Sequence, residues 1–92
     1  VLATLDAGAW HGPRFAGERL PTLAALAGFA QAEGLALNLE IKPGPGDDVR
    51  CGRVAAAEAA RLWAGAAGPA PLLSSFSKTA LSAARDAAPH LP

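Results

Sequence analysis

Apolar and polar residues alternate along Leu35–Pro43, and this alternation predicts a β-strand, because successive side chains on a strand point to opposite faces. One predicted face carries Leu35, Leu37, Leu39 and Ile41, and the other carries Ala36, Asn38, Glu40 and Lys42. Strands covered on both faces are usually apolar throughout. The polar face of this strand therefore indicates either exposure to solvent or a site.

Glu40 and Lys42 lie at the C-terminal end of this predicted strand, where parallel α/β folds place their chemistry. If both charges are buried, they need a metal or an anionic ligand to offset the cost of desolvation. If the face is exposed, they form an ordinary surface ion pair. The pattern alone favours neither interpretation.

Three other stretches repeat apolar residues at helical spacing. The first begins after Pro21 with Thr22 as its cap and ends at Gly34, which fits the left-handed position that terminates helices. The second covers 49–66, with Asp47 and Asp48 as expected caps, and the third follows Ser77 and stops at Pro89. The expected buried positions are Leu23, Leu26, Ala27, Phe29 and Ala30; Cys51, Ala55, Ala59, Leu62, Trp63 and Ala66; and Leu81, Ala84 and Ala88.

Pro71–Phe76 predicts a second short strand, so the order is helix, strand, helix, strand, helix. Two strands joined by a helix of this length imply a right-handed parallel crossover. The predicted fold class is α/β, a βαβα segment of a parallel protein. On the outer side of the second helix, Arg50, Arg53, Glu58 and Arg61 are expected to form a solvated face.

Before the first helix, glycine and proline interrupt a long loop over 6–20, and 1–5 are a short apolar helix end or strand. We expect Trp10 and Phe15 to plug this loop against the body of the protein, and His11 to lie at the surface. His90 follows the last helix and receives no role.

The 92 residues suffice for one small domain with a marginal core. Because the chain starts at Val1, not methionine, we expect it to be a piece of a longer protein. Eight basic and eight acidic residues balance, which argues against a nucleic-acid or anionic-membrane surface. No apolar run approaches the roughly 20 residues of a membrane span. The single Cys51 fits a reducing compartment and is expected to be a small core residue.

Four stretches, taken together, resemble the central part of bacterial glycerophosphodiester phosphodiesterases, particularly the cytosolic type linked to glycerol-phosphate uptake. They are Leu5–Trp10, Phe15–Leu23, Asn38–Pro43 and Leu72–Phe76, and they follow one another at the spacing of that family. A piece such as Glu-Ile-Lys is weak by itself, whereas four pieces in order are a strong match.

The resemblance implies a TIM-type (β/α)₈ barrel, incomplete in this chain because such barrels need about 250 residues. It implies a cytoplasmic enzyme of lipid and glycerol metabolism, which hydrolyses small glycerophosphodiesters to glycerol 3-phosphate and an alcohol with a divalent cation, Mg²⁺ or Ca²⁺. By motif, Glu40 corresponds to a metal ligand and Lys42 to the basic residue near the substrate phosphate. Ser75 and Phe76 correspond to the wall of the substrate pocket. Carboxylate oxygens suit such hard cations.

The chain also departs from the family pattern. The His-Arg-Gly strand, the Glu-x-Asp pair and the second catalytic histidine are absent from this sequence, so it contributes no catalytic acid or base. A non-catalytic α/β module or interface piece is therefore the main alternative. A third possibility is an aldolase-like lyase with Lys42 as a Schiff-base amine, which would require a desolvated lysine. The nearby Glu40 carboxylate works against that possibility. The oligomeric state is not predicted.

Overall fold

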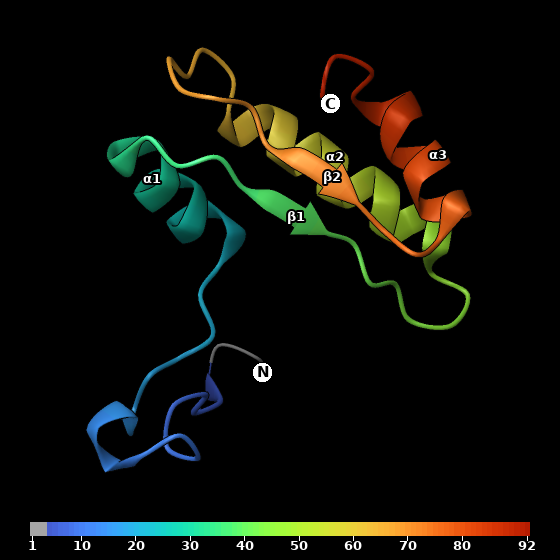
Figure 1. The fold of residues 1–92 in the computed structure, drawn as a ribbon. Helices are drawn as coiled ribbons and strands as arrows, with labels where there is room; N and C mark the ends of the chain where they lie inside the picture. Colours follow the sequence, from blue (N-terminus) through green and yellow to red (C-terminus); the bar gives the residue numbers. More distant parts are fainter. Residues whose placement is uncertain (1–3) are drawn as a thin grey trace.

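The computed structural model describes residues 4–92 and shows a small α/β arrangement of three α-helices and a two-stranded parallel sheet within that range (Figure 1). In chain order the elements are a short 3₁₀ helix η2 (Pro13–Phe15), α1 (Leu23–Glu33), β1 (Asn38–Glu40), α2 (Asp48–Leu62), β2 (Leu72–Ser74) and α3 (Lys78–Ala87). The predicted order and the parallel pairing are confirmed. Both strands are shorter than the alternation predicted. The expectation for 1–5 falls largely on residues 1–3, outside the described range.

Local side-chain chemistry fixes where two of the helices begin. The Thr22 hydroxyl accepts a hydrogen bond from Ala25 N at 3.0 Å, and the Ser77 hydroxyl accepts one from Ala80 N at 3.0 Å. Each bond satisfies an N–H group that has no partner inside the helix. Gly34 ends α1 with φ of 68°, as predicted.

The beginning of α2 differs from the expectation. Asp47 stands at the N-cap, but its side chain makes no capping hydrogen bond. The Asp48 carboxylate instead accepts a hydrogen bond from the Ser77 hydroxyl. Because Ser77 also caps α3, this bond connects the N-terminal ends of the two helices.

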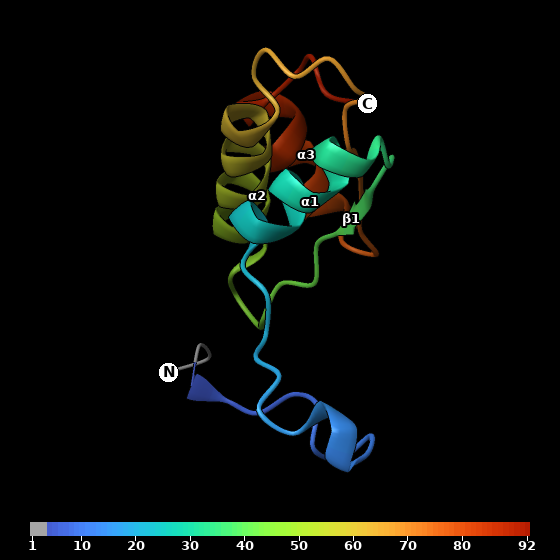
Figure 2. The same cartoon turned by 90° about the vertical axis from the view of Figure 1, so that its left-hand side faces the viewer.

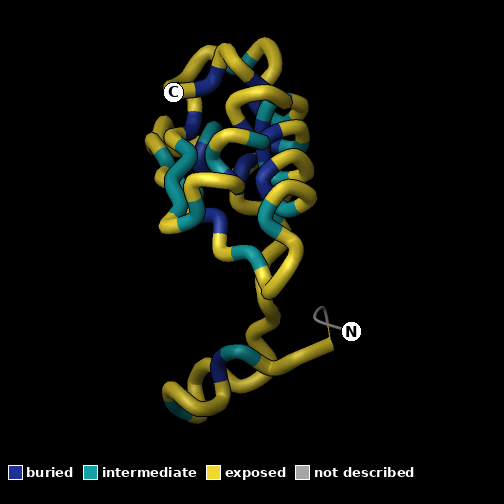
Figure 3. The backbone as a smooth tube through the Cα atoms, turned by 90° about the vertical axis from the view of Figure 1, so that its right-hand side faces the viewer, coloured by how far each residue is buried: buried dark blue, intermediate teal, exposed yellow. Residues whose placement is uncertain are grey.

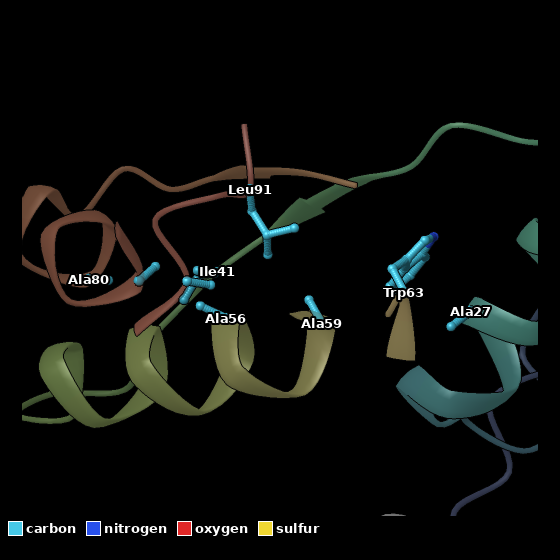
Figure 4. Close-up of a cluster of buried hydrophobic side chains, with 9 residues drawn as sticks. Ala27, Ile41, Ala56, Ala59, Trp63, Ala80 and Leu91 are labelled. Carbon is cyan, nitrogen blue, oxygen red and sulfur yellow. The ribbon is translucent and has the colours of Figure 1, made fainter. Parts of the chain in front are cut away.

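The core lies between the helices and one face of the sheet (Figure 4). Ile41, Trp63 and Leu91 are the large side chains of this cluster. Half-buried Leu39 and Leu73, which pair in the parallel sheet, pack against it. The other members are Ala27, Ala56, Ala59, Ala80, Ala84 and Ala88.

Several predicted core positions are wrong. Leu26 and Phe29 are 42% and 59% exposed, because residues 4–92 place no element over them. Cys51 is half-buried, and α2 turns a neighbouring stripe inward, burying Gly52 and Ala56 along with the predicted Ala59. The remaining predicted positions on α2, together with Leu23 and Leu81, are half-buried; Trp63, Ala27, Ala30, Ala84 and Ala88 are buried as expected.

The solvated face of α2 is confirmed. Arg50, Arg53 and Arg61 are exposed, and Arg61 donates hydrogen bonds to the carboxylate of Glu58. These bonds, and then the positive charge, lower the pKa of the Glu58 carboxyl.

The loop that precedes α1 stands apart from the helices and strands (Figure 2). Figure 3 shows that most of it is exposed. Trp10 is 84% exposed and contacts His11, whose ring lies 5.0 Å from that of Phe15. The expectation that Trp10 and Phe15 plug the loop against the body is therefore wrong, since the aromatic residues pack on one another within the loop. His11 lies at the surface, as expected.

The carboxylate of Asp6 joins the two ends of this loop. It accepts hydrogen bonds from the backbone N–H groups of Gly8, Ala9 and Gly17, each at 2.9 Å. Asp6 also forms an isolated antiparallel bridge with Arg19. Because N–H groups favour the ionised form, the bonds from Gly17, then Ala9 and Gly8, hold the pKa of Asp6 below its ordinary value.

We expect the closed loop to open as the pH falls. A carboxyl with a lowered pKa in the folded chain stabilises it fully above the ordinary pKa, and this contribution disappears as the pH drops through the lowered value. Amide hydrogen exchange at Gly17 should accelerate in that window relative to the intrinsic rate. In Asp6→Asn, exchange at Gly17 should be fast at every pH. Protection that is equal in the two proteins would contradict the role of the carboxylate.

None of the helices in residues 4–92 combines the length and the apolar character that crossing a membrane requires.

Candidate functional site

The register of the sheet puts two sets of side chains on opposite faces. Leu39 pairs with Leu73, and both face the core. The next pair, Glu40 and Ser74, therefore lies on the outer face, because strand side chains alternate. Asn38 shares this face. The predicted polar face of β1 is thus the outer face of the sheet, next to the carboxyl ends of both strands.

Glu40 and Lys42 form an exposed ion pair on that face. The Lys42 Nζ atom lies 3.6 Å from Glu40 Oε1, and the two side chains are 78% and 41% exposed. This geometry corresponds to the surface-pair interpretation of the alternation, because both charges keep their contact with water. No described residue donates a hydrogen bond to the Glu40 carboxylate, so its oxygens have free lone pairs for a ligand.

Ser75 connects the ends of the two strands. Its hydroxyl donates to the Ile41 carbonyl at 2.6 Å and accepts from Ser77 N at 3.0 Å. Since its one proton is used on the backbone, Ser75 shapes the wall of the site and offers no free donor to a ligand. Sequence alone did not predict this bond, which requires the two strand ends to be adjacent.

Two adjoining hollows bring together all four residues predicted for the site. The larger one, about 460 Å³, lies beside Lys42, and the smaller one, about 130 Å³, lies beside Glu40. Ser75 and Phe76 line both. Phe76 is 97% exposed, so it stands at the rim and its ring is available to a ligand. The larger hollow also includes Ile41, Pro43, Asp48 and Ser77, and the smaller one Ser74.

Glu40 suits one position in the coordination shell of a hard cation. Its carboxylate is an oxygen ligand on an open face, and the nearby polar groups of Asn38 and Ser74 also carry oxygen atoms. Mg²⁺ and Ca²⁺ take six or more oxygen ligands. Among residues 4–92, no group of three or more His, Cys, Asp and Glu side chains is placed to hold a metal. The residues described therefore fit one corner of such a shell and do not complete it.

Neither histidine lies at these hollows. His11 belongs to the aromatic group of the first loop, and His90 lies exposed after α3. Within residues 4–92, the structure thus brings a lysine and a carboxylate together at these hollows without an adjacent imidazole.

Asn38 and Ser74 are joined across the two strands. The Ser74 hydroxyl donates to Asn38 Oδ1 at 2.7 Å. The period-two pattern did place Asn38 on the face of Glu40. Its partner could be found only from the register of β1 and β2.

No protein-family model matches this chain, and no match to a curated protein reaches significance.

Proposed function

We propose that this chain is the central part of a metal-dependent glycerophosphodiester phosphodiesterase. The observation that carries the proposal is the convergence of Glu40, Lys42, Ser75 and Phe76 on two adjoining hollows at the carboxyl ends of parallel strands. Parallel α/β proteins bind their ligands at these ends. The four ordered stretches that resemble the family support the same proposal, including its cytoplasmic location and its (β/α)₈ barrel.

The reaction is the hydrolysis of one phosphoester bond. Water adds to phosphorus, the bond to the alcohol breaks, and glycerol 3-phosphate and the alcohol are released with the two protons of the water distributed between them. A bound Mg²⁺ or Ca²⁺ would neutralise charge on the phosphoryl oxygens. Glu40 is the residue of this chain that would hold the cation. The Lys42 ammonium, on a flexible and solvated side chain, binds the anionic oxygens and offsets the charge that develops on them.

The remaining roles follow from position. Ser75 keeps the ends of β1 and β2 together, and so fixes the distance between the Lys42 and Phe76 sides of the larger hollow. Phe76 offers an apolar rim for the carbon skeleton of the substrate. The acid and base of the reaction are assigned to residues outside this chain, because neither of its histidines lies at the hollows.

The test is release of glycerol 3-phosphate from glycerophosphocholine with MgCl₂ or CaCl₂, using the complete protein that carries this chain, with its intact mass measured first. We expect metal-dependent release by that protein and none by the 92-residue chain alone. A complete, metal-loaded protein that releases no glycerol 3-phosphate would overturn the proposal.

The competing proposal is a non-catalytic α/β module. The exposed ion pair of Glu40 with Lys42 favours it, because a surface pair needs no ligand. If the complete protein still hydrolyses its substrate after Glu40 and Lys42 are both replaced by neutral residues, this part of the protein is a non-catalytic module. The lyase alternative requires a desolvated lysine, and the Lys42 side chain, which is 78% exposed, does not favour it.

A further inference from the structure

The hydroxyl group of Ser74 does not donate to the acceptor that the sheet register places opposite it. Ser74 pairs directly with Glu40 in the sheet, and a carboxylate is the stronger acceptor for a hydroxyl donor. Its hydroxyl nevertheless donates diagonally to Asn38 Oδ1, at 2.7 Å. The only proton of Ser74 is therefore used to hold the amide of Asn38.

This bond decides which way the Asn38 amide is turned. The carbonyl oxygen of the amide points toward β2, so the Nδ2 group, on the other branch of the amide, points away from β2. No described residue accepts a hydrogen bond from Nδ2. Asn38 thus presents two free N–H donors on the face that also carries Glu40.

Glu40 lies between two possible donors along the chain. Asn38 precedes it by two residues on the same face of β1, so the two Cα atoms are about 6.6 Å apart. Lys42 lies two residues beyond the end of β1 and reaches the carboxylate with its long side chain. In the structure the carboxylate is paired with Lys42 through Oε1. When Lys42 turns to a phosphate, Glu40 loses that partner, and the Nδ2 group of Asn38 is a free donor on the same face of β1.

We propose that Ser74 and Asn38 are positioning residues for Glu40: Ser74 fixes the amide of Asn38, and Asn38 Nδ2 donates to the Glu40 carboxylate when Lys42 is drawn to an anion. The role of Glu40 as a ligand rests on the function proposed above, whereas the hydrogen bond itself does not. Carboxylates that bind metals are commonly oriented by hydrogen bonds of this kind, and loss of the partner typically lowers metal affinity about 10- to 100-fold.

The first test follows the hydrogen bond in the 92-residue chain by NMR. Asn38 and Gln31 are its only asparagine and glutamine, so the spectrum contains two side-chain amide pairs. Gln31 Nε2 donates to the Leu62 carbonyl at 2.9 Å and serves as an internal reference. In Lys42→Met we expect one Asn38 Nδ2 proton to move downfield while the Gln31 pair stays in place.

Two double variants make this result specific. The shift should vanish in Lys42→Met/Glu40→Gln, which lacks the carboxylate, and in Lys42→Met/Ser74→Ala, in which the amide is free to turn. Ser74→Thr in the same background should retain it, because threonine keeps the hydroxyl. An Asn38 pair that is unmoved by Lys42→Met, or a shift that persists without the carboxylate, would overturn the proposal.

The second test uses the phosphodiesterase assay of the complete protein. Ser74→Ala should raise the Mg²⁺ concentration for half-maximal activity about 10- to 100-fold and leave kcat at saturating Mg²⁺ nearly unchanged. Ser74→Thr should restore the wild-type value. Ser82→Ala removes an exposed hydroxyl from α3 and should have no effect. General damage to the fold would lower kcat as well, which separates it from a positioning role.

The two proposals can fail separately. Hydrolysis with an unchanged Mg²⁺ requirement in Ser74→Ala would overturn the positioning role and leave the function standing. The NMR shift in a protein without hydrolytic activity would support the hydrogen bond and overturn the function.

Discussion

Replacing Gly52 by alanine is expected to lower the free energy of unfolding by about 3 kcal/mol, the upper part of the usual range for an overpacked core. A Cβ atom at Gly52 would lie 2.1 Å from the carbonyl oxygen of Ala80 and 2.8 Å from its carbonyl carbon. Both are backbone atoms of α3 and cannot turn aside as a flexible side chain does. The helices α2 and α3 must therefore separate, and the contacts of Ala56 and Ala84 weaken with them.

Gly28→Ala is the matched control. Gly28 lies inside α1, and a Cβ atom there would meet nothing within 4 Å. The same substitution should therefore raise stability by about 0.5–1 kcal/mol, because alanine loses less conformational entropy in a helix. Urea denaturation followed by circular dichroism measures both variants. A Gly52→Ala protein as stable as Gly28→Ala would mean that α2 and α3 do not approach as closely as described.

Helix boundaries were predictable because they depend on a few adjacent residues. Thr22 and Ser77 cap α1 and α3 through hydrogen bonds to residues three positions later, and Gly34 supplies a positive φ that disfavours other residues. Such local chemistry is visible in the sequence. The cap predicted at Asp47 does not form, because its backbone (φ −104°, ψ 11°) lies outside the extended region that capping residues usually adopt. The neighbouring Asp48 carboxylate is bonded to Ser77, 29 residues later in the chain.

The buried faces were harder to predict, because alanine and glycine occupy several sides of α2. The apolar pattern gave a face through Cys51 and Ala55, whereas the helix buries Gly52 and Ala56. The face through Gly52 and Ala56 is buried because the backbones of α2 and α3 approach closely at Gly52. The sequence of α2 alone does not show where α3 packs. Hydrophobicity also failed for Trp10, since it does not specify what would cover the ring.

The part of the candidate site that lies on one strand was predictable from the sequence, whereas the contacts between strands were not. Alternation placed Asn38, Glu40 and Lys42 on one face; the structure has Asn38 and Glu40 on the outer face of β1, and Lys42, beyond the end of the strand, pairs with Glu40. Exposure of that face was not predictable, because it depends on what covers the sheet. The bond from Ser74 to Asn38 and the bond from Ser75 to Ile41 both cross between strands, so only the register could show them.

Under the proposed function, in which Glu40 holds the cation, Glu40→Gln is expected to reduce hydrolysis of glycerophosphocholine by at least about 100-fold. Loss of a ligand itself should cost more than loss of a partner that orients it, which lowers metal affinity about 10- to 100-fold. Glutamine keeps the shape of the side chain but removes the negative charge that a hard cation requires. The fold should be preserved, since an exposed side chain without hydrogen bonds from residues 4–92 usually contributes within about 0.5 kcal/mol.

Glu33→Gln provides the matched control for Glu40→Gln in the assay of the complete protein. Glu33 is exposed at the end of α1, so the same chemical change should leave the rate unchanged and improve the helix end slightly by removing a negative charge there. Rates are compared at several Mg²⁺ concentrations, with circular dichroism to verify folding. If Glu40→Gln is as active as Glu33→Gln, Glu40 does not hold the cation, and the Glu40–Lys42 pair is a surface feature. If Glu40→Gln is inactive and folded while Glu33→Gln remains active, the loss comes from the position of Glu40 and not from the chemical change. The outer face of β1 then carries the metal end of the site.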